Sequence, residues 1–245
     1  MKREIVISII LSLTTLISYC QERQHGLIIP DDYSDDDICC IYSPKEGFAV
    51  FDKPNGNEIG ILTRNAKSNT GRESGYRIYF VDNKTGAETR IDSKDFKEVG
   101  YEVMRITYFE RKDGFVRVIN QSVDYWINEK EITDKNFRVI DWQQFFIEMS
   151  GRLMGFYAND PRLDLKSEPS YNSVTKATLH GDLFEITPQN NSKGNWTKVK
   201  IRKYREHPCG TDLDDKDNIE YETDGWIEII NETGQPNLWY YSRAC

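Results

Sequence analysis

Residues 48–59 read FAVFDKPNGNEI, and residues 163–174 read LDLKSEPSYNSV. In both stretches apolar residues alternate with polar ones before a polar turn that contains Pro54 or Pro169. Alternation with a period of two is typical of a strand with one buried face, and proline is frequent in turns between strands. Each stretch therefore predicts a strand, a turn and a returning strand, and their similarity indicates an internal repeat.

The two copies agree again further along the chain. Residues 114–119 read GFVRVI, and residues 225–230 read GWIEII. In each copy an alternating strand precedes this segment and an aromatic-rich segment follows it; these are residues 103–109 and 125–127 in the first copy, and 196–204 and 239–241 in the second. The chain is therefore expected to fold the same all-β plan twice, with each half closing a small sheet around its own apolar interior.

This order of segments resembles the bacterial SH3-like domain, in which an opening strand runs into a proline-containing turn and a central strand ends in a Gly-Trp-aliphatic step. Here that step is GWI at residues 225–227, and Phe115 replaces the tryptophan in the first copy. The resemblance implies two small SH3-like β-barrels, one at residues 46–137 and the other at residues 154–245. Such domains hold extended or proline-rich peptides between aromatic side chains.

Between the copies, residues 138–153 are expected to form a linker helix. Its apolar side chains recur at the spacing of one helical face: Trp142, Phe145, Phe146 and Met149. Asp141, directly before them, is a residue type that caps helix N-termini, and the pattern ends near Gly151. A short helix is marginal in water, so we expect this aromatic face to pack on one or both barrels. A ligand-binding role for the face is the alternative.

The start of the chain has the pattern of an export signal. Lys2 and Arg3 precede an apolar run at residues 5–17, which is shorter than a bilayer-spanning helix requires. Residues 1–19 are therefore expected to be a signal peptide, and the protein is expected to lie outside the cytosol.

Cys20 directly follows this segment, which makes the signal similar to that of a bacterial lipoprotein. In that family the cysteine is acylated and becomes the first residue of the mature chain. The resemblance implies lipidation at Cys20 and a place in the cell envelope, at the outer membrane or facing the periplasm. An ordinary secretory peptide cut nearby, with Cys20 left as a spare thiol, is the alternative.

Residues 20–45 are then expected to be a lipidated tether. Two prolines, Pro30 and Pro44, lie in a segment that is rich in aspartate. The aspartates are Asp31, Asp32, Asp35, Asp36 and Asp37. Neighbouring carboxylates repel one another and keep such a segment extended. A calcium site is the sharper alternative.

Four cysteines remain beside Cys20, and an oxidising compartment favours disulfides between them. Cys209 and Cys245 both lie in the last part of the chain, so we expect a bridge between these two. Cys39 and Cys40 would then form a strained vicinal pair or stay reduced. The competing pattern joins that pair to Cys209 and Cys245.

Composition argues against several classes of function. The chain has 245 residues, 40 of them acidic and 32 basic, and its formal net charge is −8. Binding to nucleic acid requires a basic surface that neutralises phosphates, so DNA and RNA are not expected partners. The chain has no glycine-rich phosphate loop or dinucleotide fingerprint, and no cofactor is expected.

An enzyme is not expected either, because candidates for catalysis are few. The chain has three histidines, and His207 lies two residues from Cys209. This pair could act as the nucleophile and base of a hydrolase, but no third group that would orient the base is evident. A second acidic segment lies at residues 212–220. An EF-hand loop that began at Asp212 would need a glycine at its sixth position and a carboxylate at its twelfth, but these positions hold Asp217 and Thr223, so no metal site is assigned there. A solvated loop is expected, and a looser calcium site is the alternative.

Binding is the remaining role, and aromatic side chains on the predicted strands are the candidate contacts. They are Tyr76, Tyr79, Trp239, Tyr240 and Tyr241. The expected partner is a peptide-like segment, an envelope protein or the stem peptides of the cell wall, and the membrane is reached through the lipid anchor. A structural spacer or assembly subunit is the alternative function, and the oligomeric state is not predicted.

Overall fold

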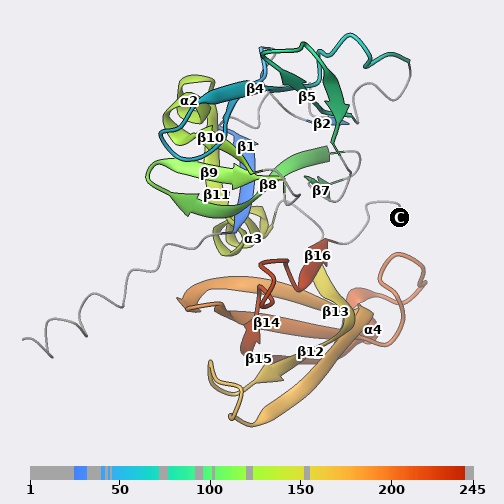
Figure 1. The fold of residues 1–245 in the computed structure, drawn as a ribbon. Coiled ribbons are helices and arrows are strands. Elements are labelled where there is room, and N and C mark those ends of the chain that lie inside the picture. Colours follow the sequence, from blue (N-terminus) through green and yellow to red (C-terminus); the bar gives the residue numbers. More distant parts are fainter. Residues whose placement is uncertain are drawn as a thin grey trace, which may run out of the picture.

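The structure is a computed structural model. It describes residues 25–31, 40–41, 44, 46–71, 77–91, 96–100, 103–119, 124–151 and 155–240. Strands dominate, in agreement with the all-β expectation, and they form two sheets that lie on either side of one short helix (Figure 1). No helix in the described part of the chain is long and apolar enough to cross a membrane.

The first sheet contains 11 strands. They are β1 (Gly26–Pro30), β2 (Cys40–Ile41), β3 (Phe48–Phe51), β4 (Glu58–Thr63), β5 (Tyr79–Asp82), β6 (Glu88–Arg90), β7 (Phe96–Gly100), β8 (Val103–Lys112), β9 (Phe115–Val118), β10 (Tyr125–Asn128) and β11 (Phe137–Asp141). Their order is β11-β1-β8-β9-β10-β3-β4-β5-β6, and β2 and β7 also pair with β8. Helix α2 (Glu129–Asp134) connects β10 to β11.

The second sheet follows helix α3 (Trp142–Met149) and contains five strands. They are β12 (Phe156–Lys166), β13 (Thr175–Lys193), β14 (Trp196–Tyr204), β15 (Ile219–Glu228) and β16 (Leu238–Tyr240), with the short helix α4 (Asp215–Asn218) before β15. Because β12 pairs with both β13 and β15, four of the strands form a closed ring of pairings, and β16 extends the sheet beyond β12. Among the described strands of the first sheet no pairing closes such a ring.

The strand-turn-strand prediction is confirmed in both copies. In the first copy β3 pairs with β4 in antiparallel register, with Phe48 opposite Leu62. In the second copy the end of β12 pairs with β13, with Leu163 opposite Leu179. The aromatic-rich segments also take similar places, because β10 pairs with β3 and β16 pairs with β12.

The second match between the copies does not hold in three dimensions. Gly114 lies in the tight turn between β8 and β9, where Asp113 and Gly114 have φ values of 51° and 77°. Gly225 instead lies inside β15, where a Cβ atom would come within 2.7 Å of the carbonyl oxygen of Lys166. The first glycine is needed for a positive φ and the second for a close approach of two strands, so the similar sequences serve different needs.

The prediction that residues 20–45 form a tether is wrong for the apolar residues 26–30. Residues 26–30 form β1, which pairs with both β11 and β8 inside the first sheet. Leu27, Ile28 and Ile29 are each 0% exposed. Burial of three consecutive apolar side chains is strongly favourable, so residues 26–30 are part of the folded sheet.

Helix α3 forms with the predicted cap and apolar face, but the expected bounds of 138–153 are too wide, because residues 138–141 pair with β1 as part of β11. The Asp141 carboxylate accepts a hydrogen bond from the backbone N–H of Gln144 at 2.8 Å, and Gly151 follows the helix with a φ of 86°. Gln143 also faces inward and donates from Nε2 to the carbonyl of Trp196 at 3.2 Å and to the hydroxyl of Thr197. These bonds fix the helix to β14.

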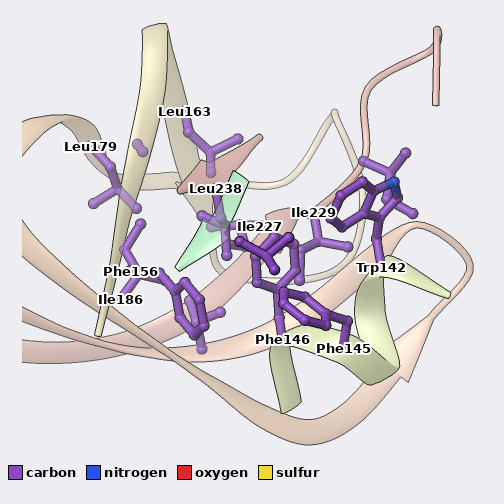
Figure 2. Packing of buried hydrophobic residues seen from close by; sticks show 14 of the residues in the cluster. Trp142, Phe145, Phe146, Phe156, Leu163, Leu179, Ile186, Ile227, Ile229 and Leu238 are labelled. Carbon is purple, nitrogen blue, oxygen red and sulfur yellow. The ribbon is translucent and has the colours of Figure 1, made fainter. Parts of the chain in front are cut away.

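The aromatic face of α3 is core, as expected, and it belongs to a core that both sheets share. This shared core contains Trp142, Phe145 and Phe146 of the helix together with side chains of the second sheet; Figure 2 shows Phe145 and Phe146 beside Ile227 and Ile229. It also contains Leu27, Ile29, Val99 and Ile140 from the first sheet. A second cluster, which includes Ile28 and Ile132 of α2, lies within the first half of the chain alone. The expectation that each half shields its own interior is therefore wrong for the second half.

Candidate functional site

Tyr79, one of the candidate ligand contacts, is buried in the structure. This residue lies on β5 and is 6% exposed, so its ring belongs to the core of the first sheet. Tyr76 and Tyr241, two further candidates, lie outside the described residues. In a strand half of the side chains must point inward, and sequence alone could not tell which half contained this tyrosine.

Trp239 and Tyr240 lie where the two sheets meet. The ammonium group of Lys97, on β7 of the first sheet, is 5.8 Å from the centre of the Trp239 ring. Burial, and then the carboxylate of Glu98 on the same strand, raise the pKa of Tyr240 to about 12. Burial also lowers the pKa of Lys97. These partly buried rings therefore contact the other sheet.

The cysteine and histidine candidates lie in the loop between β14 and β15. Cys209 is in a disulfide, and its backbone N–H donates to Nδ1 of His207 at 3.1 Å. Cys20, Cys39 and Cys245 lie outside the described residues, so the Cys209–Cys245 pairing stays a prediction. A disulfide sulfur is not a thiolate nucleophile, and the Cys/His pair in this structure offers no free thiol.

Metal ligands do not gather in the described part of the chain. No group of three or more histidine, cysteine, aspartate or glutamate side chains is placed there to hold an ion. In the acidic loop, Asn218 is 2% exposed and its side chain bonds the backbone of Glu206 in both directions, at 2.9 and 3.0 Å. The loop is therefore held by an amide side chain.

A pocket of about 210 Å³ opens where β8, β11 and α3 meet. Two arginines line it, and each already binds a carboxylate with two of its three guanidinium nitrogens. Arg111 contacts Glu129 at 2.7 Å twice, and Arg138 contacts Glu148 with its two terminal nitrogens. A ligand anion would have to displace one of these ion pairs, so this pocket is poorly suited to bind one.

An exposed aromatic surface lies elsewhere, on the second sheet, and none of the sequence-based candidates belongs to it. We call it the aromatic corner and define it as Tyr171, Val174 and Trp196. Tyr171 and Val174 lie in the turn between β12 and β13 and are 66% and 72% exposed. Trp196 begins β14, and its ring meets that of Tyr171 edge to face, with centroids 5.1 Å apart and planes at 70°. Tyrosine and tryptophan rings at the surface are enriched in protein interfaces, so this ring pair is a candidate interaction site.

The tyrosine of the aromatic corner is held in place. Its hydroxyl donates to the Glu228 carboxylate on β15. This bond is the main reason that the pKa of Tyr171 rises to about 12. The ring therefore keeps a fixed orientation although most of it faces solvent. Because the side chain is already ordered, binding of a partner costs the protein little conformational entropy there.

Charged side chains surround the aromatic corner. Trp196 and Lys198 point outward on β14, because the residues that alternate with them, Thr197 and Val199, are 0% exposed. Lys198 lies 3.2 Å from Asp224 on β15 and lowers the pKa of that carboxyl group. An aromatic centre with a charged rim is the usual anatomy of a protein interface.

The sequence contained a signal for this surface. Tyr171 is the single aromatic residue in the quoted stretch LDLKSEPSYNSV, and Trp196 directly follows the turn residues Gly194 and Asn195. An aromatic side chain in a polar turn has no sheet face to bury it. What the sequence could not show is that the turn folds back onto the first residue of β14.

Comparison with protein-family models, with curated proteins and with solved structures found no match. The interpretation of the aromatic corner therefore depends on the geometry and chemistry of this chain alone.

The N-terminal histidine makes a further contact between the two sheets. His25 directly precedes β1, and a Cβ atom on Gly234, in the turn before β16, would lie 2.1 Å from its Nδ1. That nitrogen is buried and has no hydrogen-bond partner among the described residues. Burial, and then the positive charge of Arg117, lower the pKa of His25, while Glu110 opposes them.

Stability is therefore expected to decrease as the pH falls below about 6.5, the ordinary pKa of histidine. Below that value the unfolded chain binds a proton at His25 that the folded protein still excludes, so acid favours unfolding until the lowered pKa is reached. Urea titrations at pH 7.5 and 5.5 measure the slope of the free energy of unfolding against pH. The His25→Gln substitution should reduce this slope. An unchanged slope in this variant would show that His25 is not its source.

Proposed function

We propose that the protein is a non-catalytic lipoprotein of the cell envelope that binds an extended peptide-like segment of an envelope partner at the aromatic corner. In this proposal Cys20 carries the lipid anchor. The observation that supports binding most directly is the exposure of Tyr171, at 66%, together with the edge-to-face contact of its ring with Trp196. Side chains of this kind dominate the energy of protein interfaces.

In this proposal the second half of the chain is the part that most resembles an SH3-like domain. Its support is the closed ring of pairings among β12, β13, β14 and β15, together with an aromatic residue in the first turn that contacts a tryptophan at the start of the third strand. An extended segment fits such a surface because it loses little conformational entropy on binding. The first half departs further from this plan, since its sheet is larger and incorporates β1.

Replacing Trp196 by alanine is expected to weaken binding at least about 30-fold, because an interface hot spot contributes 2 kcal/mol or more. The wild-type protein is used to capture partners from purified cell-wall fragments and from envelope proteins, and the affinity of each captured partner is then measured for both proteins. Tyr171→Ala should weaken binding in the same way.

Tyr221→Ala is the matched control. Tyr221 is also an exposed aromatic side chain, 39% exposed, but it lies at the opposite end of β15 from Glu228. Its loss should leave binding unchanged. The proposal fails if neither pool contains a saturable partner, or if every partner binds the Trp196→Ala variant as tightly as the wild type.

A structural spacer is the second candidate function. The observation that favours it is the shared core, since two sheets packed on one helix can hold surfaces at a fixed separation. A spacer would keep its complex when Trp196 is replaced, whereas a peptide-binding protein would lose it. The binding experiment therefore separates the two functions.

A further inference from the structure

Residue 25, the first residue that the structure describes, follows the proposed lipid anchor by only five positions. From Gly26 onward the chain is fixed, because this residue lies between Asp141 on β11 and Tyr108 on β8. One residue earlier, the carbonyl of His25 accepts a hydrogen bond from the backbone N–H of Trp142 at 3.3 Å. The start of β1 is therefore attached to the first turn of α3.

The distance from this point to Cys20 has a covalent upper limit. Cys20 precedes His25 by five residues. A fully extended chain spans at most about 3.3–3.6 Å per residue, so in any conformation the two Cα atoms lie within about 18 Å of each other. A tether that ran to residue 45 would have allowed a distance several times larger.

The surface around His25 is formed by both sheets, and we call it the N-terminal face. It contains His25, the ion pair of Glu110 and Arg117 at 3.1 Å, and the turn at residues 231–234. The Asn231 side chain accepts hydrogen bonds from the backbone N–H groups of Thr233 and Gln235 at 2.9 and 3.0 Å, which makes this turn a well-defined part of the face. Glu232 and Thr233 are exposed on it.

We propose that the N-terminal face lies directly against the lipid bilayer in the anchored protein. This inference depends on the proposed acylation of Cys20, because it is the acyl chains that place residue 20 at the membrane surface. Arg117 is paired with Glu110, and the whole chain carries a formal net charge of −8, so charge does not attract this face to anionic lipids. The covalent anchor and the short chain after it hold the face there.

The same geometry indicates where the partner is met. The backbone N–H of Ile229, two residues before the turn at residues 231–234, donates to the carbonyl of Asn195, directly before Trp196, at 2.9 Å. Gln143, next to the residue that binds His25, donates to the carbonyl of Trp196. The aromatic corner therefore adjoins the N-terminal face, and the segment that it binds is one held close to the membrane surface.

The test uses the full chain, produced in a bacterium and purified with its lipid. A fluorescent amino acid replaces Glu232 on the N-terminal face or, in the matched control, Lys84 in the exposed turn after β5, which Figure 1 shows far from the start of β1. The protein is reconstituted in vesicles of phosphatidylethanolamine and phosphatidylglycerol that carry a nitroxide quencher on the headgroups. The fluorophore at position 232 should be quenched several-fold more strongly than the one at position 84.

A longer linker gives the second control. A Gly/Ser insertion of about 20 residues between Gln21 and Glu22 has a root-mean-square length of about 25 Å, and it should remove most of the difference between the two positions. Equal quenching at both positions in acylated protein would overturn the inference and leave the lipid anchor standing. A mass spectrum without acyl chains on Cys20 would overturn the anchor and the inference together.

Discussion

Replacing Phe146 by alanine is expected to lower the free energy of unfolding by about 3–5 kcal/mol. Phe146 is 1% exposed, and its ring lies 4.9 Å from that of Phe156 on β12 and 5.9 Å from that of Trp142. The substitution leaves a cavity at the point where α3 joins the second sheet. Urea unfolding followed by near-ultraviolet circular dichroism measures the loss.

Gln144→Ala is the control for this prediction, because Gln144 is exposed on the same helix. This substitution should lower the free energy of unfolding by no more than about 0.5 kcal/mol. Since the shared core includes Leu27, Ile29 and Ile140, the Phe146→Ala variant should still unfold in a single transition that involves both sheets. A loss below about 1 kcal/mol, or a first sheet that melts at its old midpoint while the second melts earlier, would contradict the shared core.

A chain that begins at residue 31 is expected not to fold. It lacks β1, whose Leu27, Ile28 and Ile29 are 0% exposed and divide between the two apolar clusters. Loss of each such side chain costs about 2–5 kcal/mol, so the three together approach the whole stability of an ordinary domain, about 5–15 kcal/mol. The backbone groups of β8 and β11 that bond to β1 would also lose their partners.

The matched control for this truncation is a chain that begins at residue 25, which keeps β1 and should unfold with the midpoint of the full chain. Hydrogen exchange and thermal unfolding compare the two. A cooperative transition in the shorter chain, with a melting temperature within a few degrees of the control, would mean that residues 26–30 are only a tether, as the sequence suggested.

Local patterns predicted the parts of the fold that depend on neighbouring residues. The spacing of four apolar side chains and the position of Asp141 predicted α3, its cap and its buried face. The alternating stretches around Pro54 and Pro169 predicted two hairpins. Hydrogen bonds within a helix or across a short turn join residues that are close in sequence, so they leave a signal that can be found in one stretch of chain.

The candidate site was not predicted, because the type of an aromatic residue does not indicate where in the fold its ring lies. Tyr79 is buried, and Trp239 and Tyr240 contact β7 of the other sheet. Tyr171 meets Trp196 only because its turn folds back onto the start of β14. Whether an aromatic ring lies in a core, between two sheets or in solvent depends on segments far away in the sequence.

The sequence by itself determined that the chain is mostly β, that a capped amphipathic helix divides it, and that two similar hairpins open its halves. Only the tertiary structure decided that β1 belongs to the folded body, that Gly114 and Gly225 have different roles, and that one core serves both sheets. The physical reason is the range of the interactions. Strand pairing and core packing join residues such as Leu27, Phe146 and Ile227, and no local pattern records which distant strand a buried side chain will meet.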